Sequence, residues 1–207
     1  MLKLYRIRNS TNVERVGLAL AHKGLAAESV WVPAGDRREV RNVSGQDLVP
    51  VLVDGGRVVV DSMEIVRYLE KRHPDRPRLY PEDPSRRADL LVFIDWFNRV
   101  WKRPPNEITD ELEKPEAERD PKRIDRLGKA MHGSLHLFEQ MLSGREHLHG
   151  DFSAADVCAF PFLKYATIHD PDDDETFHRV LVEYQKPGTT HPRLVDWIAR
   201  VNARPRV

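Results

Sequence analysis

The chain has 207 residues, a length that fits one large domain or two small ones. Apolar residues make up 40% of it, enough for a cooperative hydrophobic core, so disorder as the ground state is excluded. The 33 basic and 33 acidic residues cancel, and no global charge favours nucleic acid or an anionic membrane surface as a partner.

Cysteine content and the lack of long apolar runs predict the compartment. The single cysteine, Cys158, cannot form an internal disulfide, and its apolar neighbours predict a buried side chain. The N-terminus lacks the apolar run of a secretory signal, and no stretch reaches the roughly 18 apolar residues of a membrane span. We expect a soluble, cytoplasmic protein.

The first part of the chain alternates strand and helix patterns. Residues 3–7 alternate in polarity as a strand does, and residues 13–20 carry apolar side chains at helical spacing before Gly24, a helix stop. Residues 29–32 fit a second strand. The polar segment 34–41 that follows predicts at most a short, poorly anchored helix.

A hairpin and a third helix complete this part. The β-branched runs 49–53 and 57–60 flank Asp54-Gly55-Gly56, a strong hairpin signal. Residues 61–64 have the spacing of a helix capping box. The predicted order over residues 1–80 is therefore β-α-β-α-β-β-α.

Residues 85–207 carry only helical patterns. Apolar spacing predicts helices over 85–102 and 121–143, a capping box over 153–156 starts another, and a last helix runs from about Pro192. We expect a second, all-helical domain over residues 85–207, after a proline-spaced connector.

Three motifs occur in a fixed order. They are Val49-Pro50-Val51-Leu52, which fits V-P-x-L; the nine residues from Asp61 to Leu69, which fit [ED]-S-x-x-I-x-x-Y-L; and the seven from Gly150 to Asp156, which fit G-D-x-[ST]-x-A-D. Together they resemble the cytosolic glutathione S-transferases over nearly the whole chain. The resemblance implies a thioredoxin-like domain over residues 1–80 and a helical bundle over 85–207.

The segment from Arg8 to Asn12 resembles the serine-type transferases, including the zeta-like and theta-like groups. The resemblance implies that Ser10, together with Asn12, stabilises the glutathione thiolate. Lowering a thiol pKa by about two requires roughly 2.7 kcal/mol of preferential anion binding. A hydroxyl donor contributes about 1.5–3 kcal/mol to a charged acceptor, and a helix N-terminus about 0.3–1 kcal/mol.

Simpler explanations stay open for these residues. From position alone, Ser10, Thr11 or Asn12 is a helix cap. Asn12, Thr11 and Tyr5 also stay open as the residue that activates the thiol in place of Ser10. No cysteine lies near residue 10, which disfavours mixed-disulfide chemistry.

The resemblance also assigns the residues that would bind glutathione. Ser62 and its backbone would hold the γ-glutamyl carboxylate, and Asp61 the ammonium group. Pro50 would be cis, leaving the Val49 backbone to pair with the peptide ligand. Taken alone, helix capping by Asp61 and an ordinary edge-strand proline explain the same residues.

The glycine carboxylate of glutathione needs a cation or an amide. The candidates are Arg37, Arg38, Arg41 and Gln46. Leu48 stands where the family often has lysine or glutamine before Val-Pro, so the usual contact at that position is in doubt.

The electrophile pocket should be apolar, with Trp96, Arg99 and Trp101 as candidates. A core role fits Trp101 equally well. We expect Pro104-Pro105 to break this helix. No metal is expected, because His132 and His136 lack the acidic partner of a metalloprotease pattern.

The predicted function is a glutathione transferase, active in detoxification, that adds the glutathione thiolate to a small electrophile. The alternatives are a zeta-like glutathione-dependent isomerase and a non-catalytic interaction module of the same fold. The resemblance implies a homodimer.

Overall fold

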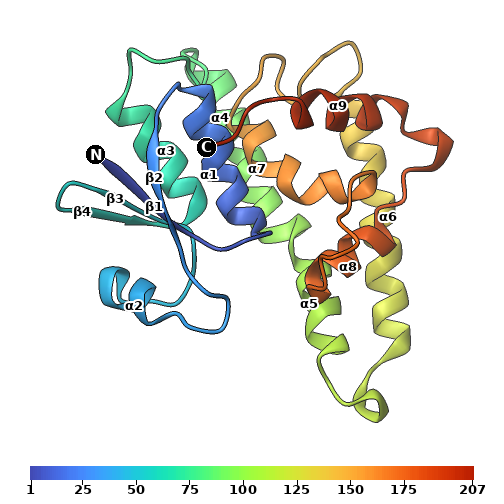
Figure 1. Cartoon of the computed structure of the whole chain (residues 1–207). Coiled ribbons are helices and arrows are strands. Elements are labelled where there is room, and N and C mark those ends of the chain that lie inside the picture. Colours follow the sequence, from blue (N-terminus) through green and yellow to red (C-terminus); the bar gives the residue numbers. More distant parts are fainter. The chain divides into compact units, whose positions relative to one another are not determined.

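The computed structural model describes residues 1–207. Two compact units make up the chain: Met1–Pro81 with Arg204–Val207, and Glu82–Ala203 (Figure 1). The first combines a mixed sheet with helices and the second is all-helical, as the sequence patterns predict.

A four-stranded sheet forms the centre of the first unit. Its strands are β1 (Leu2–Arg6), β2 (Ala27–Trp31), β3 (Val51–Asp54) and β4 (Arg57–Val60). Their spatial order is β2-β1-β3-β4; β1 and β2 are parallel, and β3 is antiparallel to both β1 and β4. The hairpin predicted around Asp54-Gly55-Gly56 is therefore confirmed.

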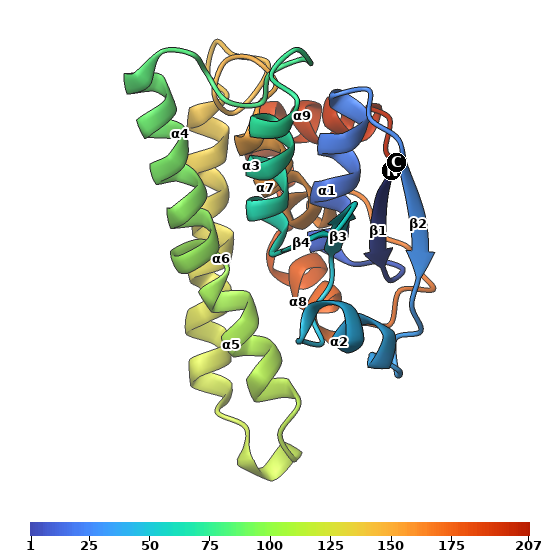
Figure 2. The same cartoon turned by 90° about the vertical axis from the view of Figure 1, so that its left-hand side faces the viewer.

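Alternating side chains give the sheet two buried faces. Leu4 and Leu52, opposite each other on β1 and β3, are fully buried on the face that α1 (Thr11–His22) and α3 (Ser62–Arg72) cover (Figure 2). Helix α1 ends before Gly24, whose φ of 63° is in the left-handed region that suits glycine. Helix α1 follows β1 and helix α3 follows β4, and these two strands run in the same direction because both are antiparallel to β3. Both helices therefore begin at the same end of the sheet.

Helix α2 (Arg38–Ser44) is better anchored than its polar sequence predicts. Val40 is fully buried and packs with Val32 and Val51 on the other face of the sheet. A helix of seven residues has too few turns to show a periodic pattern, so a single buried valine gave no usable signal.

The second unit contains six α-helices. They are α4 (Pro84–Trp96), α5 (Arg103–Leu112), α6 (Pro121–Met141), α7 (Ala154–Leu163), α8 (Thr176–Tyr184) and α9 (Pro192–Asn202). The capping box predicted for α7 is present, since Ser153 Oγ accepts from the Ala155 N–H and Asp156 accepts from the Ser153 N–H. Helix α8 follows an acidic loop and was not expected.

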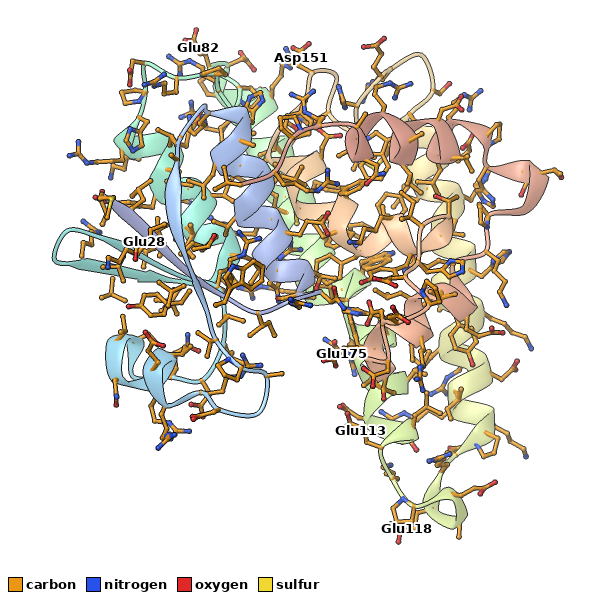
Figure 3. The ribbon with its side chains drawn as sticks, in the orientation of Figure 1. Glu28, Glu82, Glu113, Glu118, Asp151 and Glu175 are labelled. Atoms are coloured by element: carbon orange, nitrogen blue, oxygen red, sulfur yellow. The ribbon has the colours of Figure 1, made fainter.

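The helix that contains Trp101 ends just before Pro104-Pro105, and a separate helix, α5, begins at Arg103. A π-helical turn over Phe97–Trp101, closed by a 3.0 Å bond from Lys102 N–H to Phe97 O, leads directly into α5. The two prolines occupy the first turn of α5, where an N–H has no intrahelical partner and proline is tolerated. Glu113 and Glu118 lie at the far end of the resulting α5–α6 hairpin (Figure 3).

No helix of the chain has both the length and the apolar character that crossing a bilayer requires.

Candidate functional site

A hollow of about 210 Å³ opens on the first unit. It is lined by Asn12, Gln46, Leu48, Val49, Pro50, Val60, Asp61 and Ser62. Six of these are site residues expected from the sequence, and they come from the first turn of α1, the segment after α2, and the start of α3. Ser10 and Arg37 are not among its lining residues.

The Val49–Pro50 peptide bond is cis, as the resemblance implies. The ladder of β3 begins one residue later, where Val51 is opposite Val60. Val49 therefore lies just ahead of the paired part of the strand, at the rim of the hollow.

Asp61 caps α3 and shapes the opposite rim. Its Oδ1 accepts hydrogen bonds from Met63 N–H at 2.9 Å and Glu64 N–H at 3.1 Å. Its φ of 68° is unusual for a residue with a side chain, and these two bonds stabilise it. Ser62 is the first residue of α3, so its own backbone N–H has no intrahelical acceptor.

A buried arginine connects α1 to α3 beside the hollow. The Arg15 side chain is only 2% exposed, and its Nη1 donates to Asn12 Oδ1 and to Ser62 Oγ, each at 3.2 Å. Ser62 Oγ in turn donates to Asn12 Oδ1 at 3.4 Å. Arginine can only donate, so this contact fixes the Asn12 oxygen and leaves the Nδ2 donors of the amide for another partner.

Arg15 carries no role in the sequence-based prediction. The signal that could have found it is its position on the apolar face of α1, between Val13 and Val16, where a cation needs buried acceptors.

Ser10 is the N-cap of α1, and its Oγ accepts from Val13 N–H at 3.3 Å. A hydroxyl that accepts one bond still has its proton to donate, so capping and thiolate binding are compatible. Of the alternatives, Thr11 is buried and Tyr5 packs against the Val40 cluster under α2.

The four candidates for the glycine carboxylate differ in their partners. Arg38 pairs with Asp36 and lowers the pKa of that carboxyl to about 2. Arg41 pairs with Asp47 at 2.7 Å and lowers its pKa as well.

The other two candidates are Gln46 and Arg37. The Gln46 amide bonds the N–H and the carbonyl of Leu48, at 3.1 and 2.9 Å. Arg37 Nη1 is buried and has no hydrogen-bond partner. Arg37 is thus the one of the four with a buried donor left over.

The three residues expected at an electrophile pocket have different surroundings in the structure. Trp101 is 4% exposed, stacks on Phe97 at 4.4 Å between ring centroids, and donates from Nε1 to Ser134 Oγ at 2.9 Å. It belongs to the aromatic core of the helical unit. Arg99 is exposed and pairs with Asp95, and Trp96 is half-buried.

Two further hollows occur in the helical unit, of about 350 and 420 Å³, and neither is lined by these three residues. No three His, Cys, Asp or Glu side chains of the chain are arranged to hold a metal ion.

Two family models match the chain in series. Residues 4–77 match the glutathione S-transferase N-terminal domain, and residues 106–205 match the glutathione S-transferase C-terminal domain. The matches span both structural units.

Relatives agree with these models. Glutathione S-transferase GstB of Escherichia coli is 27% identical over all of this chain and 96% of its own length. The maleylacetoacetate isomerase of Pseudomonas aeruginosa is 40% identical over 94 residues, 42% of this chain and 44% of its own.

A solved structure matches as well. It is the theta class glutathione S-transferase of Xanthomonas axonopodis pv. citri with glutathione bound, 27% identical with a TM-score of 0.69, covering 99% of this chain and 93% of its own. The fold, the two domain models in series and these relatives together place the chain in the glutathione S-transferase family, as a glutathione transferase.

Proposed function

We propose that glutathione binds in the hollow and extends past its lining to Ser10, whose hydroxyl donates a hydrogen bond to the thiolate. The enzyme then adds this thiolate to a small electrophilic carbon. One observation carries the proposal. Val49, which precedes the paired part of β3, and the N-termini of α1 and α3 lie at the same end of the sheet.

The N-terminus of α3 suits the γ-glutamyl end of glutathione. The Ser62 N–H and the partial positive charge of the helix start attract a carboxylate. Asp61 uses Oδ1 for capping, and its Oδ2 remains for the ammonium group. In this arrangement Val49 pairs with the peptide backbone of glutathione, as an added strand does.

The N-terminus of α1 suits the thiolate. The Ser10 hydroxyl proton and the helix start would together provide the roughly 2.7 kcal/mol that lowers a thiol pKa by about two. Asn12 is the second donor, because Arg15 holds its oxygen and leaves Nδ2 available. The buried Arg15 guanidinium adds positive charge behind both.

Arg37 is the proposed partner of the glycine carboxylate. Its buried, unpartnered Nη1 would gain a charge-assisted hydrogen bond, whereas Arg38 and Arg41 would have to exchange existing carboxylate partners.

Calorimetric titration with reduced glutathione tests the binding proposal. We expect saturable binding at pH 7 with release of a proton, measured by repeating the titration in buffers of different ionisation enthalpy. Binding without proton release would contradict thiolate formation, and no binding would contradict the site itself.

A glutathione-dependent isomerase is the second candidate, favoured by the match to the maleylacetoacetate isomerase. In such a reaction the thiolate adds to a cis double bond, the product rotates about the new single bond, and elimination restores glutathione. The test is a product analysis with maleylacetoacetate, in which isomerisation leaves total glutathione unchanged and conjugation consumes it.

The family resemblance further suggests a cytoplasmic homodimer that acts in detoxification. Sedimentation equilibrium tests the dimer.

A further inference from the structure

The last four residues described, Arg204–Val207, belong to the first unit and lie along α1 (Figure 1). Val207 N–H donates to Gly17 O at 3.2 Å, and Arg6 Nη1 donates to Val207 O at 2.8 Å. A Cβ on Gly17 would lie 3.1 Å from that same oxygen, so the approach is close enough to favour glycine there. We call residues 204–207 the tail segment.

The tail segment carries an arginine to the first turn of α1. Arg206 Nε donates to Glu14 Oε1 at 2.9 Å, and the two side chains are 26% and 13% exposed. Arg206 Nη1 also donates to the Arg204 carbonyl at 2.7 Å, which fixes the direction of the guanidinium. The pair is therefore more enclosed than the surface pairs of this chain, such as Arg99–Asp95 with side chains 79% and 61% exposed.

Glu14 is the one acidic residue in the first turn of α1. Its N–H donates to the Ser10 carbonyl at 3.0 Å, so it lies one helical turn from the cap. A carboxylate there is favourable for the helix but opposes a second anion at the same helix start. An anionic thiolate beside Ser10 would meet this repulsion.

We propose that Arg206 is a positioning residue for the glutathione reaction, which offsets the charge of Glu14 at the N-terminus of α1 so that a thiolate can form beside Ser10. The inference rests on the proposed role of that helix start. It adds a residue almost 200 positions away in the sequence to the determinants of thiol reactivity.

Other charged groups lie near α1 or on the elements beside it, and Arg206→Gln and Glu14→Gln leave them unchanged. They are Arg8 before the cap, Arg15 on α1, Asp61, Glu64 and Arg67 at or in α3, Arg6 at the end of β1, Arg37, Arg41 and Asp47 around α2, and His22 and Arg204 at the far end of α1.

The test compares pH profiles of kcat/KM for glutathione conjugation to 1-chloro-2,4-dinitrobenzene. Arg206→Gln should lower kcat/KM about three- to fourfold at pH 6.5, the factor that the uncompensated Glu14 charge about one helical turn away produces at a dielectric near that of water. The loss should disappear above the pKa of the bound thiol. Glu14→Gln should restore kcat/KM in the Arg206→Gln background.

Arg204→Gln is the matched control. Arg204 donates from its side chain to His22 Nδ1, so its removal disturbs the tail segment at the other end of α1 from Glu14. It should leave the pH profile unchanged. A shift as large as that of Arg206→Gln, or a double variant that stays impaired, would show a structural role and overturn the proposal.

The wild-type titration separates the two levels of inference. If glutathione binds without proton release, the proposed function fails at the thiolate step. If the wild type releases a proton and the Arg206→Gln profile matches that of the wild type, only the role of Arg206 fails.

Discussion

The two units use their buried polar side chains in different ways. In the first unit, Arg15 and Ser62 are almost fully buried and bond to one another and to Asn12 at the rim of a hollow. In the second, the buried carboxylates of Asp156 and Glu139 accept hydrogen bonds that complete helix starts. The first unit thus places buried polar groups beside a site, although its buried Lys23 serves the fold by binding Glu70 and two backbone carbonyls, whereas these two carboxylates of the second unit serve the fold alone.

Asp156 is an example of a buried carboxylate in the second unit whose hydrogen-bonding capacity is used within the fold. The carboxylate is fully buried and accepts from Leu148 N–H, Ser153 N–H and Oγ, and Trp197 Nε1 at 2.8–3.2 Å. Such a carboxylate has little capacity left for a ligand, whereas Ser62 N–H and Asp61 Oδ2 in the first unit do.

The largest expected effect is on stability in the second unit. Asp156→Ala leaves several buried donors without an acceptor and should cost about 3–5 kcal/mol of unfolding free energy. Urea denaturation measures it, with the exposed Asp151→Ala as control. A loss below about 1 kcal/mol would contradict the assigned role of this carboxylate.

Next is the effect of Ser10→Ala on activity. Loss of a donor worth roughly 2 kcal/mol should lower kcat/KM about thirtyfold at pH 7, with a smaller effect on stability because only one cap bond is lost. The measurement is steady-state conjugation kinetics. If Asn12→Ala lowers kcat/KM more than Ser10→Ala does, the main hydrogen-bond donor to the thiolate is Asn12.

Arg37→Ala should affect binding more than turnover. Loss of the carboxylate contact should raise the Kd for glutathione about five- to tenfold and leave kcat near that of the wild type. Arg38→Ala is the control, because its guanidinium is exposed and already paired with Asp36. Equal effects of the two variants would argue against a specific role for Arg37.

The smallest effect is a pH dependence of stability from His22. Arg204 donates to its Nδ1 at 3.1 Å, so the proton is on Nε2, which donates to Arg78 O. Burial, with a smaller contribution from Arg204, lowers the pKa of His22 below its usual value.

The sign of this dependence follows from the lowered pKa of His22. The unfolded chain takes up the proton first, so the free energy of unfolding falls as the pH drops through about 6.5 and is unaffected at pH 8. Urea titrations at pH 8 and 5.5 should show a smaller drop for His22→Gln than for the wild type. A larger drop in the variant would contradict the direction.

Local signals in the sequence predicted local structure well. The hairpin at Asp54-Gly55-Gly56 and the capping box at Ser153–Asp156 are set by residues within a few positions of each other, so spacing is enough to find them. Pro104-Pro105 likewise mark a change of helix, since α5 begins at Arg103 and the two prolines occupy its first turn.

Long-range contacts were beyond such rules. Arg15 contacts Ser62 across 47 positions, and Arg206 contacts Glu14 across 192. No spacing rule connects residues so far apart. Trp101 likewise fitted a pocket or a core equally well until its stacking on Phe97 placed it in the core.

The sequence by itself determined the two-domain fold class, the order of the elements and most of the residues around the hollow, because short motifs encode strand turns and helix starts. Only the tertiary structure decided which side chains have hydrogen-bonding capacity left for a ligand. Arg37 retains an unpartnered donor while Arg38 and Arg41 are paired. That difference depends on neighbours brought together by folding, and a linear pattern of residues does not contain it.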